Sequence, residues 1–149
     1  MKRFSLYPVV LALVFSSFAL AAPPTFEEVE AVYQKMSSNV TDSIDIGKHL
    51  VGFECELQIN LIAHAQGWLA KVEHVQDMLR IDSLVQNEAD RERIRPLISR
   101  RLKFMAENVE GTINSANLIT ANAKSPAVVA SANTLKENLR SLKALLLKF

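Results

Sequence analysis

A long stripe of apolar residues with helical spacing dominates the middle of this chain. Its members are Leu50, Phe53, Leu57, Leu61, Trp68, Val72, Val75 and Leu79. Steps of three or four residues keep side chains on one face of an α-helix, whereas the side chains of a strand alternate every second residue. We therefore predict a long helix over about residues 44–84, with Gly47 and Gly52 marking the region where it is most easily broken.

The opposite side of this predicted helix is apolar as well. The residues that fall there are Val51, Cys55, Ile59, Ile62, Leu69, Ile81 and Leu84. A helix that is apolar on two sides packs between two partners. Two arrangements follow: either this is the central helix of a bundle, or its second side, with Cys55, Ile59 and Ile62, forms a homodimer interface.

Residues typical of helix starts predict further helices before and after this one. Thr25 and Glu28 have the spacing of a capping box, which predicts a helix over about residues 26–39, followed by a polar break over 38–45. Asn87 is a candidate N-cap for a third helix that fades near residue 122. Pro96 either starts that helix late or kinks it.

The last helix has the clearest apolar stripe. Ser125-Pro126 offers an N-cap followed by proline in the first turn. The stripe that follows consists of Val128, Ala132, Leu135, Leu139, Leu142 and Leu146. Because short loops between long amphipathic helices make neighbours antiparallel, we predict an all-α fold: an elongated up-and-down bundle of three to four helices, forming a single domain over residues 22–149.

The first residues have the features of a secretory signal peptide. Lys2 and Arg3 precede an uncharged, mostly apolar run over 6–20, which ends in Ala-Leu-Ala. The run is shorter than the ~20 residues that span a bilayer, so we predict cleavage before Ala22 and no stable membrane insertion afterwards. The protein is then exported, to the periplasm in a Gram-negative bacterium and otherwise to the exterior.

Charge is distributed unevenly along the rest of the chain. Residues 22–90 carry twelve acids and four bases, whereas residues 91–149 carry eleven bases and four acids. These charges nearly cancel, so we expect no bulk attraction for nucleic acid. The basic cluster is Arg91, Arg93, Arg95, Arg100, Arg101 and Lys103, of which Arg93, Arg100 and Lys103 share the outer side of the predicted helix. Acids on neighbouring helices neutralise this cluster in the favoured interpretation; in the alternative, it docks to an acidic partner or an anionic lipid surface.

Signatures of catalysis and metal binding are missing. The sequence has no Gly-rich phosphate loop, no nucleophile elbow and no His-Glu-x-x-His pair. His49, His64 and His74 lie too far apart along one helix to share a metal ion. We therefore expect no enzyme activity, no metal and no resident cofactor. Cys55, the single cysteine, is expected to be a buried apolar residue or to form an intermolecular disulfide.

These observations favour an exported, non-catalytic helical protein that acts through protein–protein interaction. An adaptor, a chaperone-like factor or an inhibitor of the immunity-protein kind would fit, with an unidentified protein partner. The candidate partner-binding residues are Arg93, Arg100, Lys103, Cys55, Ile59 and Ile62. The alternative is a bundle that binds a small ligand, haem or lipid around Trp68 and a substantially buried His64.

Overall fold

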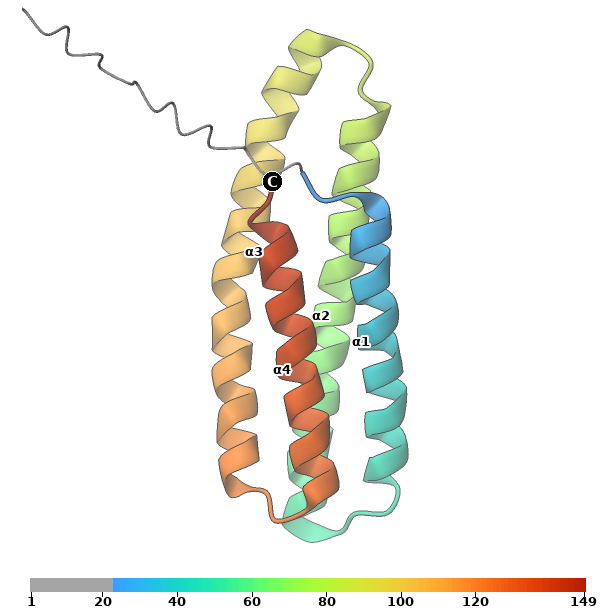
Figure 1. Ribbon diagram of the computed structural model, residues 1–149, viewed down its shortest axis with the longest axis vertical. Coiled ribbons are helices and arrows are strands. Elements are labelled where there is room, and N and C mark those ends of the chain that lie inside the picture. Colours follow the sequence, from blue (N-terminus) through green and yellow to red (C-terminus); the bar gives the residue numbers. More distant parts are fainter. Residues whose placement is uncertain (1–22) are drawn as a thin grey trace, which may run out of the picture.

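The computed structural model describes residues 23–149, which form four α-helices and no strand. The helices are α1 (Phe26–Gly47), α2 (Gly52–Leu84), α3 (Glu88–Asn122) and α4 (Pro126–Leu146). They run alternately up and down in an elongated bundle (Figure 1), which confirms the predicted fold class. α2 has 33 residues, and α3 is slightly longer with 35. The predicted signal peptide, residues 1–21, lies outside the described residues.

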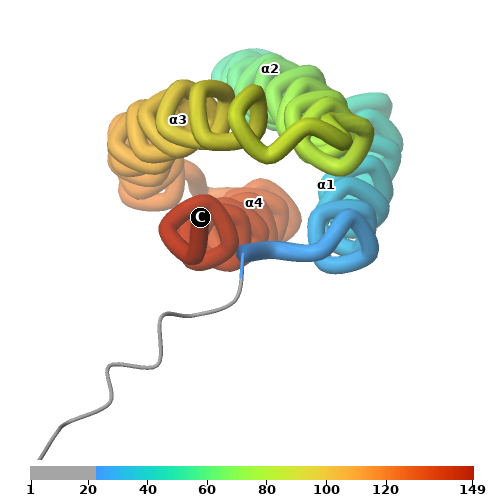
Figure 2. The backbone as a smooth tube through the Cα atoms, turned by 90° about the horizontal axis from the view of Figure 1, so that it is seen from above, coloured from blue at the N-terminus to red at the C-terminus, as the bar shows by residue number. Residues whose placement is uncertain are grey.

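The four helices surround one hydrophobic core. Viewed from above, α2 and α4 approach each other across the core, whereas α1 and α3 lie apart (Figure 2). Trp68, Leu102, Leu135, Leu139 and Leu142 are among the largest of its fully enclosed side chains. The hairpin of α2 and α3 extends beyond the first turn of α1 and the last turn of α4 (Figure 1).

The polar stretch 38–45 is helical, so the predicted break there is wrong. α1 continues through it to Gly47 because the bundle buries two polar residues of this stretch, Asn39 and Ser43. Ser43 is buried and shares a 2.6 Å hydrogen bond with Ser131 of α4, and the Gln58 amide donates to the Ser43 carbonyl at 2.9 Å. These polar side chains belong to the core, and the chain turns only over residues 48–51.

α2 accordingly begins at Gly52, whose φ of 59° is in the left-handed region that glycine adopts without strain. Most of its predicted stripe is buried, but Phe53 is 58% exposed. The second apolar side faces outward: Ile59, Ile81 and Leu84 are all more than half exposed. α2 is therefore not the central helix of the bundle.

α3 runs without interruption from Glu88, so Pro96 does not delay its start. Pro96 is exposed, and water can solvate the backbone carbonyl that loses its helical partner there. Ser125 is the N-cap of α4, but its side chain makes no capping bond. Instead, the Glu54 carboxylate accepts hydrogen bonds from the N–H groups of Lys124 and Ser125 at 2.7 and 3.2 Å.

The predicted capping box at the start of α1 is present, and its Glu28 also bonds a residue near the end of the chain. The Glu28 N–H donates to the Thr25 hydroxyl at 3.2 Å, and the Thr25 N–H donates to the Glu28 carboxylate at 2.9 Å. Lys148 Nζ donates to the same carboxylate at 2.7 Å. The bonds from Lys148 and Thr25 lower the pKa of Glu28 below its ordinary value.

This lowered pKa predicts a small acid sensitivity. The stabilisation from Glu28 is fully present above the pKa that this carboxyl group has in the unfolded chain. It is lost as the pH falls through the lower pKa that Glu28 has in the folded protein. We expect Glu28→Gln to flatten the acid side of the stability–pH curve, measured by urea unfolding. Glu27→Gln removes the same charge at the adjacent exposed position and serves as the control. An equal effect of both substitutions would contradict the assignment.

Candidate functional site

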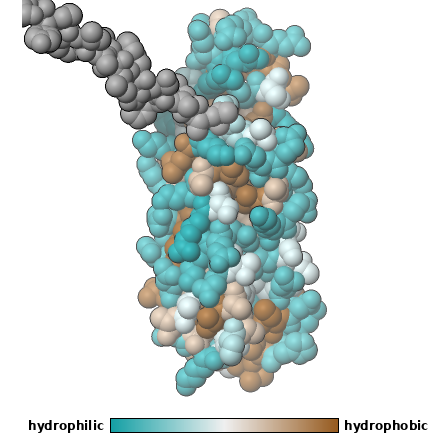
Figure 3. Space-filling model, viewed as in Figure 1, coloured by the Kyte–Doolittle hydropathy of each residue, from teal (hydrophilic) through white to brown (hydrophobic). Residues whose placement is uncertain are grey.

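Exposed apolar side chains gather on α2 and α3. The large ones on these two helices are Phe53, Ile59, Ile81, Leu84, Leu97, Phe104 and Leu118. By contrast, α1 exposes Ile44 alone among its described residues, and α4 exposes none within its helical span. The face seen in Figure 3 is mainly hydrophilic, with hydrophobic residues in patches below the grey segment and toward the lower end. An uneven distribution of this kind is typical of proteins that bind a partner on one side.

The N-terminal half of α3 presents an ordered stripe to solvent. Arg93, Leu97, Arg100 and Phe104 follow one another by steps of four, three and four residues, and all four are exposed. Leu97 is 62% exposed and Phe104 54%. A cation therefore alternates with an apolar side chain along one line of the helix surface. Lys103 is exposed as well, so the structure exposes all three of the basic residues predicted to lie outward.

Two neighbouring clefts lie along this stripe, and the first of them reaches α2. The first, of about 200 Å³, is lined by Lys71, His74, Arg101, Phe104, Met105 and Asn108. The second, of about 410 Å³, is lined by Leu97, Arg100, Arg101 and Phe104. Both are open to solvent, and no acidic residue lines either of them. We call the exposed residues of the stripe and of these two clefts, together with the neighbouring Lys103, the α2–α3 face.

Aromatic rings hold two of the cations on this face. Lys71 Nζ lies 4.0 Å from the centre of the Trp68 ring, and the Arg101 guanidinium lies 5.9 Å from the centre of the Phe104 ring. These contacts orient the charged groups without neutralising them, because a ring face carries no net charge. The α2–α3 face therefore presents positive charge on a partly apolar floor.

Ion pairs neutralise only part of the basic cluster. Arg95 donates to both oxygens of Asp82 on α2, at 3.1 and 3.3 Å, and these bonds raise the pKa of its guanidinium. Arg91 pairs with Glu88 on its own helix at 3.4 Å. Within residues 23–149, the other four basic residues of the cluster have no acidic group within 4.0 Å. The favoured expectation of neutralisation by neighbouring helices is thus wrong for most of the cluster.

Trp68 and His64, the residues proposed for a small-ligand site, differ in burial. Trp68 is 2% exposed, and its indole N–H donates to the Thr112 hydroxyl at 2.7 Å. It is part of the packed core. His64 is half-buried, short of the substantial burial expected. Among the described residues, no group of three or more His, Cys, Asp or Glu side chains could hold a metal ion.

The predicted homodimer residues occupy different environments on α2. Cys55 and Ile62 are half-buried. Ile62 lies close to α1, because a Cβ added to Gly47 would be 3.9 Å from its side chain. Ile59 is 56% exposed. The three therefore do not form one continuous exposed patch, and a homodimer through them stays a prediction.

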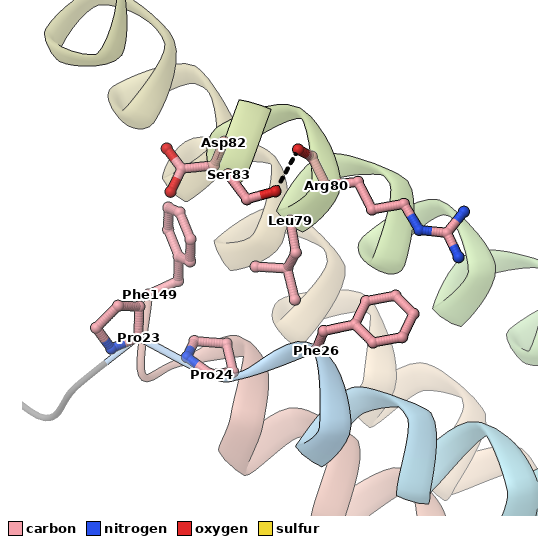
Figure 4. Close-up of a pocket in the computed structure, with 8 residues that line it drawn as sticks. All are labelled: Pro23, Pro24, Phe26, Leu79, Arg80, Asp82, Ser83 and Phe149. Carbon is pink, nitrogen blue, oxygen red and sulfur yellow. Dashed lines mark hydrogen bonds between the residues drawn. The ribbon is translucent and has the colours of Figure 1, made fainter. Parts of the chain in front are cut away.

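A second pair of clefts lies under the protruding hairpin. Figure 4 shows the first, of about 410 Å³, where Leu79 points into the space between Phe26, Pro24 and the terminal Phe149. The second, of about 430 Å³, lies between Phe149, Pro96 and Arg95. Asp82, at the edge of the first cleft, has its carboxylate engaged by Arg95, and in the figure the Arg80 guanidinium points away from it. The polar groups here are thus mostly committed to contacts within the chain.

Comparisons with known proteins add no relative: no family model, curated protein or solved structure matches this chain. None of the four described helices has both the length and the apolar character required to cross a membrane.

Sequence reasoning missed the apolar half of the α2–α3 face. Leu97 and Phe104 were not among the candidate residues, although their spacing from Arg93 and Arg100 is visible in the sequence. The participation of Lys71 and His74 has no such signal, because it depends on how α2 and α3 align against each other.

Proposed function

We propose that this protein is a non-catalytic binding protein that recognises another protein through the α2–α3 face. The observation that carries the proposal is the exposed stripe of Arg93, Leu97, Arg100 and Phe104, whose two arginines have no acidic partner within residues 23–149. Interfaces commonly combine arginine with aromatic and aliphatic anchors. An exported adaptor, a chaperone-like factor or an inhibitor would each use such a face.

The fold can tolerate this use because the face contributes little to the core. The cations point to solvent, and most core residues of α3 lie on its other side: Ile98, Leu102, Val109 and Ile113 are all buried. A partner can therefore cover the α2–α3 face without rearrangement of the bundle.

Photo-crosslinking from position 104 tests the proposal. A benzophenone amino acid in place of Phe104 keeps an aromatic ring at the centre of the face. In the native host, we expect ultraviolet light to give a discrete adduct with one partner protein. The same amino acid in place of Leu147, which is 58% exposed at the end of α4, is the matched control and should give no such adduct. Equal adducts from both positions, or none from either, would contradict the proposal.

A small-ligand-binding bundle is the second candidate, and the open apolar cleft beside Phe149 is the feature that favours it. A ligand that remains bound during purification would appear in the native mass spectrum, and a haem would also show in the visible absorption spectrum. Loss of that signal on Phe149→Ser would place the ligand in this cleft.

A further inference from the structure

Exposed residues on and beside the α2–α3 face repeat at intervals of seven. On α3 these are Leu97, Phe104, Gly111 and Leu118, and on α2 they are Gly67, His74 and Ile81. The two sets belong to one surface, because His74 and Phe104 line the same cleft. A seven-residue repeat keeps contact positions turned toward a neighbouring helix that packs at a shallow angle.

Two glycines leave the middle of this surface without protruding side chains. Gly67 and Gly111 each precede one member of the hydrogen-bonded pair Trp68–Thr112, so they lie at nearly the same height on the two helices. Both are exposed, and a Cβ built on either would meet no atom within 4 Å. A third helix could therefore approach the two backbones closely at this height.

The charge of the face indicates the chemistry of such a helix. Lys71, Arg100 and Arg101 line clefts that contain no acid. Of the exposed acids on neighbouring turns, Asp77 lies 3.9 Å from Arg80, Glu73 accepts a hydrogen bond from Tyr33 of α1, and Glu110 pairs with Lys143 of α4. Glu107 is the one that remains next to Phe104 along α3. The surplus is positive, and carboxylates on a partner would offset it.

From these observations, and resting on the proposed function, we infer that the partner presents an acidic amphipathic helix, which lies along the groove between α2 and α3. Its apolar side chains cover Leu97 and Phe104, and its carboxylates meet Lys71, Arg100 and Arg101. An anionic membrane is the less suitable occupant. The cation-lined cleft between the helices is concave, so it admits single side chains but not a flat lipid surface.

A designed peptide tests this inference with the full chain. The probe is a stapled helix of about five turns with leucine at intervals of seven and glutamate on the flanking positions. We expect saturable binding in fluorescence anisotropy, weakening as salt is added. A peptide with glutamine in place of every glutamate should bind much more weakly. Equal binding of the two peptides would overturn the inference.

Charge reversal locates the binding site. Arg100→Glu/Arg101→Glu should weaken the acidic peptide about tenfold or more, because two attractive contacts become repulsive. The same variant should bind a lysine-substituted peptide better than the wild type does. Lys35→Glu/Arg140→Glu changes the net charge equally on exposed positions of α1 and α4, and should leave affinity for the acidic peptide almost unchanged. Equal losses from both double variants would overturn the inference.

Vesicles separate the two kinds of occupant. Wild-type protein should not co-sediment with phosphatidylglycerol vesicles more than with phosphatidylcholine vesicles. Selective co-sedimentation without peptide binding would overturn the inference in favour of a membrane surface. If the crosslink from position 104 forms but no acidic peptide binds, the proposed function stands and this inference fails.

Discussion

Trp68→Ala is expected to lower the free energy of unfolding by about 3–5 kcal/mol, the range found when a large aromatic side chain is removed from a packed core. Trp68 is 2% exposed, and its indole N–H bonds Thr112 across the α2–α3 interface. The substitution leaves a cavity and a hydroxyl without its donor, and urea unfolding followed by circular dichroism measures the loss.

Trp68→Phe provides the control for that experiment. It keeps most of the ring but removes the donor to Thr112, so it should cost about 1–2 kcal/mol, closer to the price of one hydrogen bond. A loss below about 1 kcal/mol for Trp68→Ala would show that α2 and α3 do not pack around this side chain.

Leu139→Ala should destabilise the bundle by about 2–5 kcal/mol. Leu139 is fully enclosed in α4, and a close-packed core relaxes only partly around a cavity. Leu147→Ala removes the same side chain from a 58% exposed position and should change the unfolding free energy by less than about 0.5 kcal/mol. Similar values for the two variants would show that α4 is not docked against the other helices.

Local signals were sufficient to predict most of the fold. The capping box of Thr25 and Glu28, the Asn87 cap and the Ser125-Pro126 start all lie where helices begin. These features act within one turn, so sequence spacing alone reveals them. The apolar stripe of α4, from Val128 to Leu146, was also visible in the sequence spacing, and it is buried along its whole length.

The errors arose where tertiary contacts override local preference. Residues 38–45 are polar enough for a loop, but inside the core the Ser43 carbonyl accepts from Gln58 of α2 and the Ser43 hydroxyl bonds Ser131 of α4. The second apolar side of α2 indicated burial, yet Ile59 and Ile81 face solvent. In both cases, the outcome depends on where a helix distant in sequence packs. Hydrophobic periodicity within one segment does not reveal the position of that helix.

The candidate site was predicted only in part for the same reason. Arg93, Arg100 and Lys103 could be placed on an outer face from helical geometry alone. The cleft that brings Lys71 and His74 opposite Arg101 depends on the register between α2 and α3. That register is fixed by long-range contacts such as Trp68–Thr112 and Asp82–Arg95, which no local spacing predicts.

The crosslink yield from position 104 before and after reversal of Arg93, Arg100 and Lys103 to glutamate is the most direct measurement of the central claim. These three residues are exposed, so the melting temperature should hardly change. If the α2–α3 face binds the partner, the adduct should disappear in the triple variant while the bundle remains folded. An undiminished adduct in a folded triple variant would contradict partner recognition through this face.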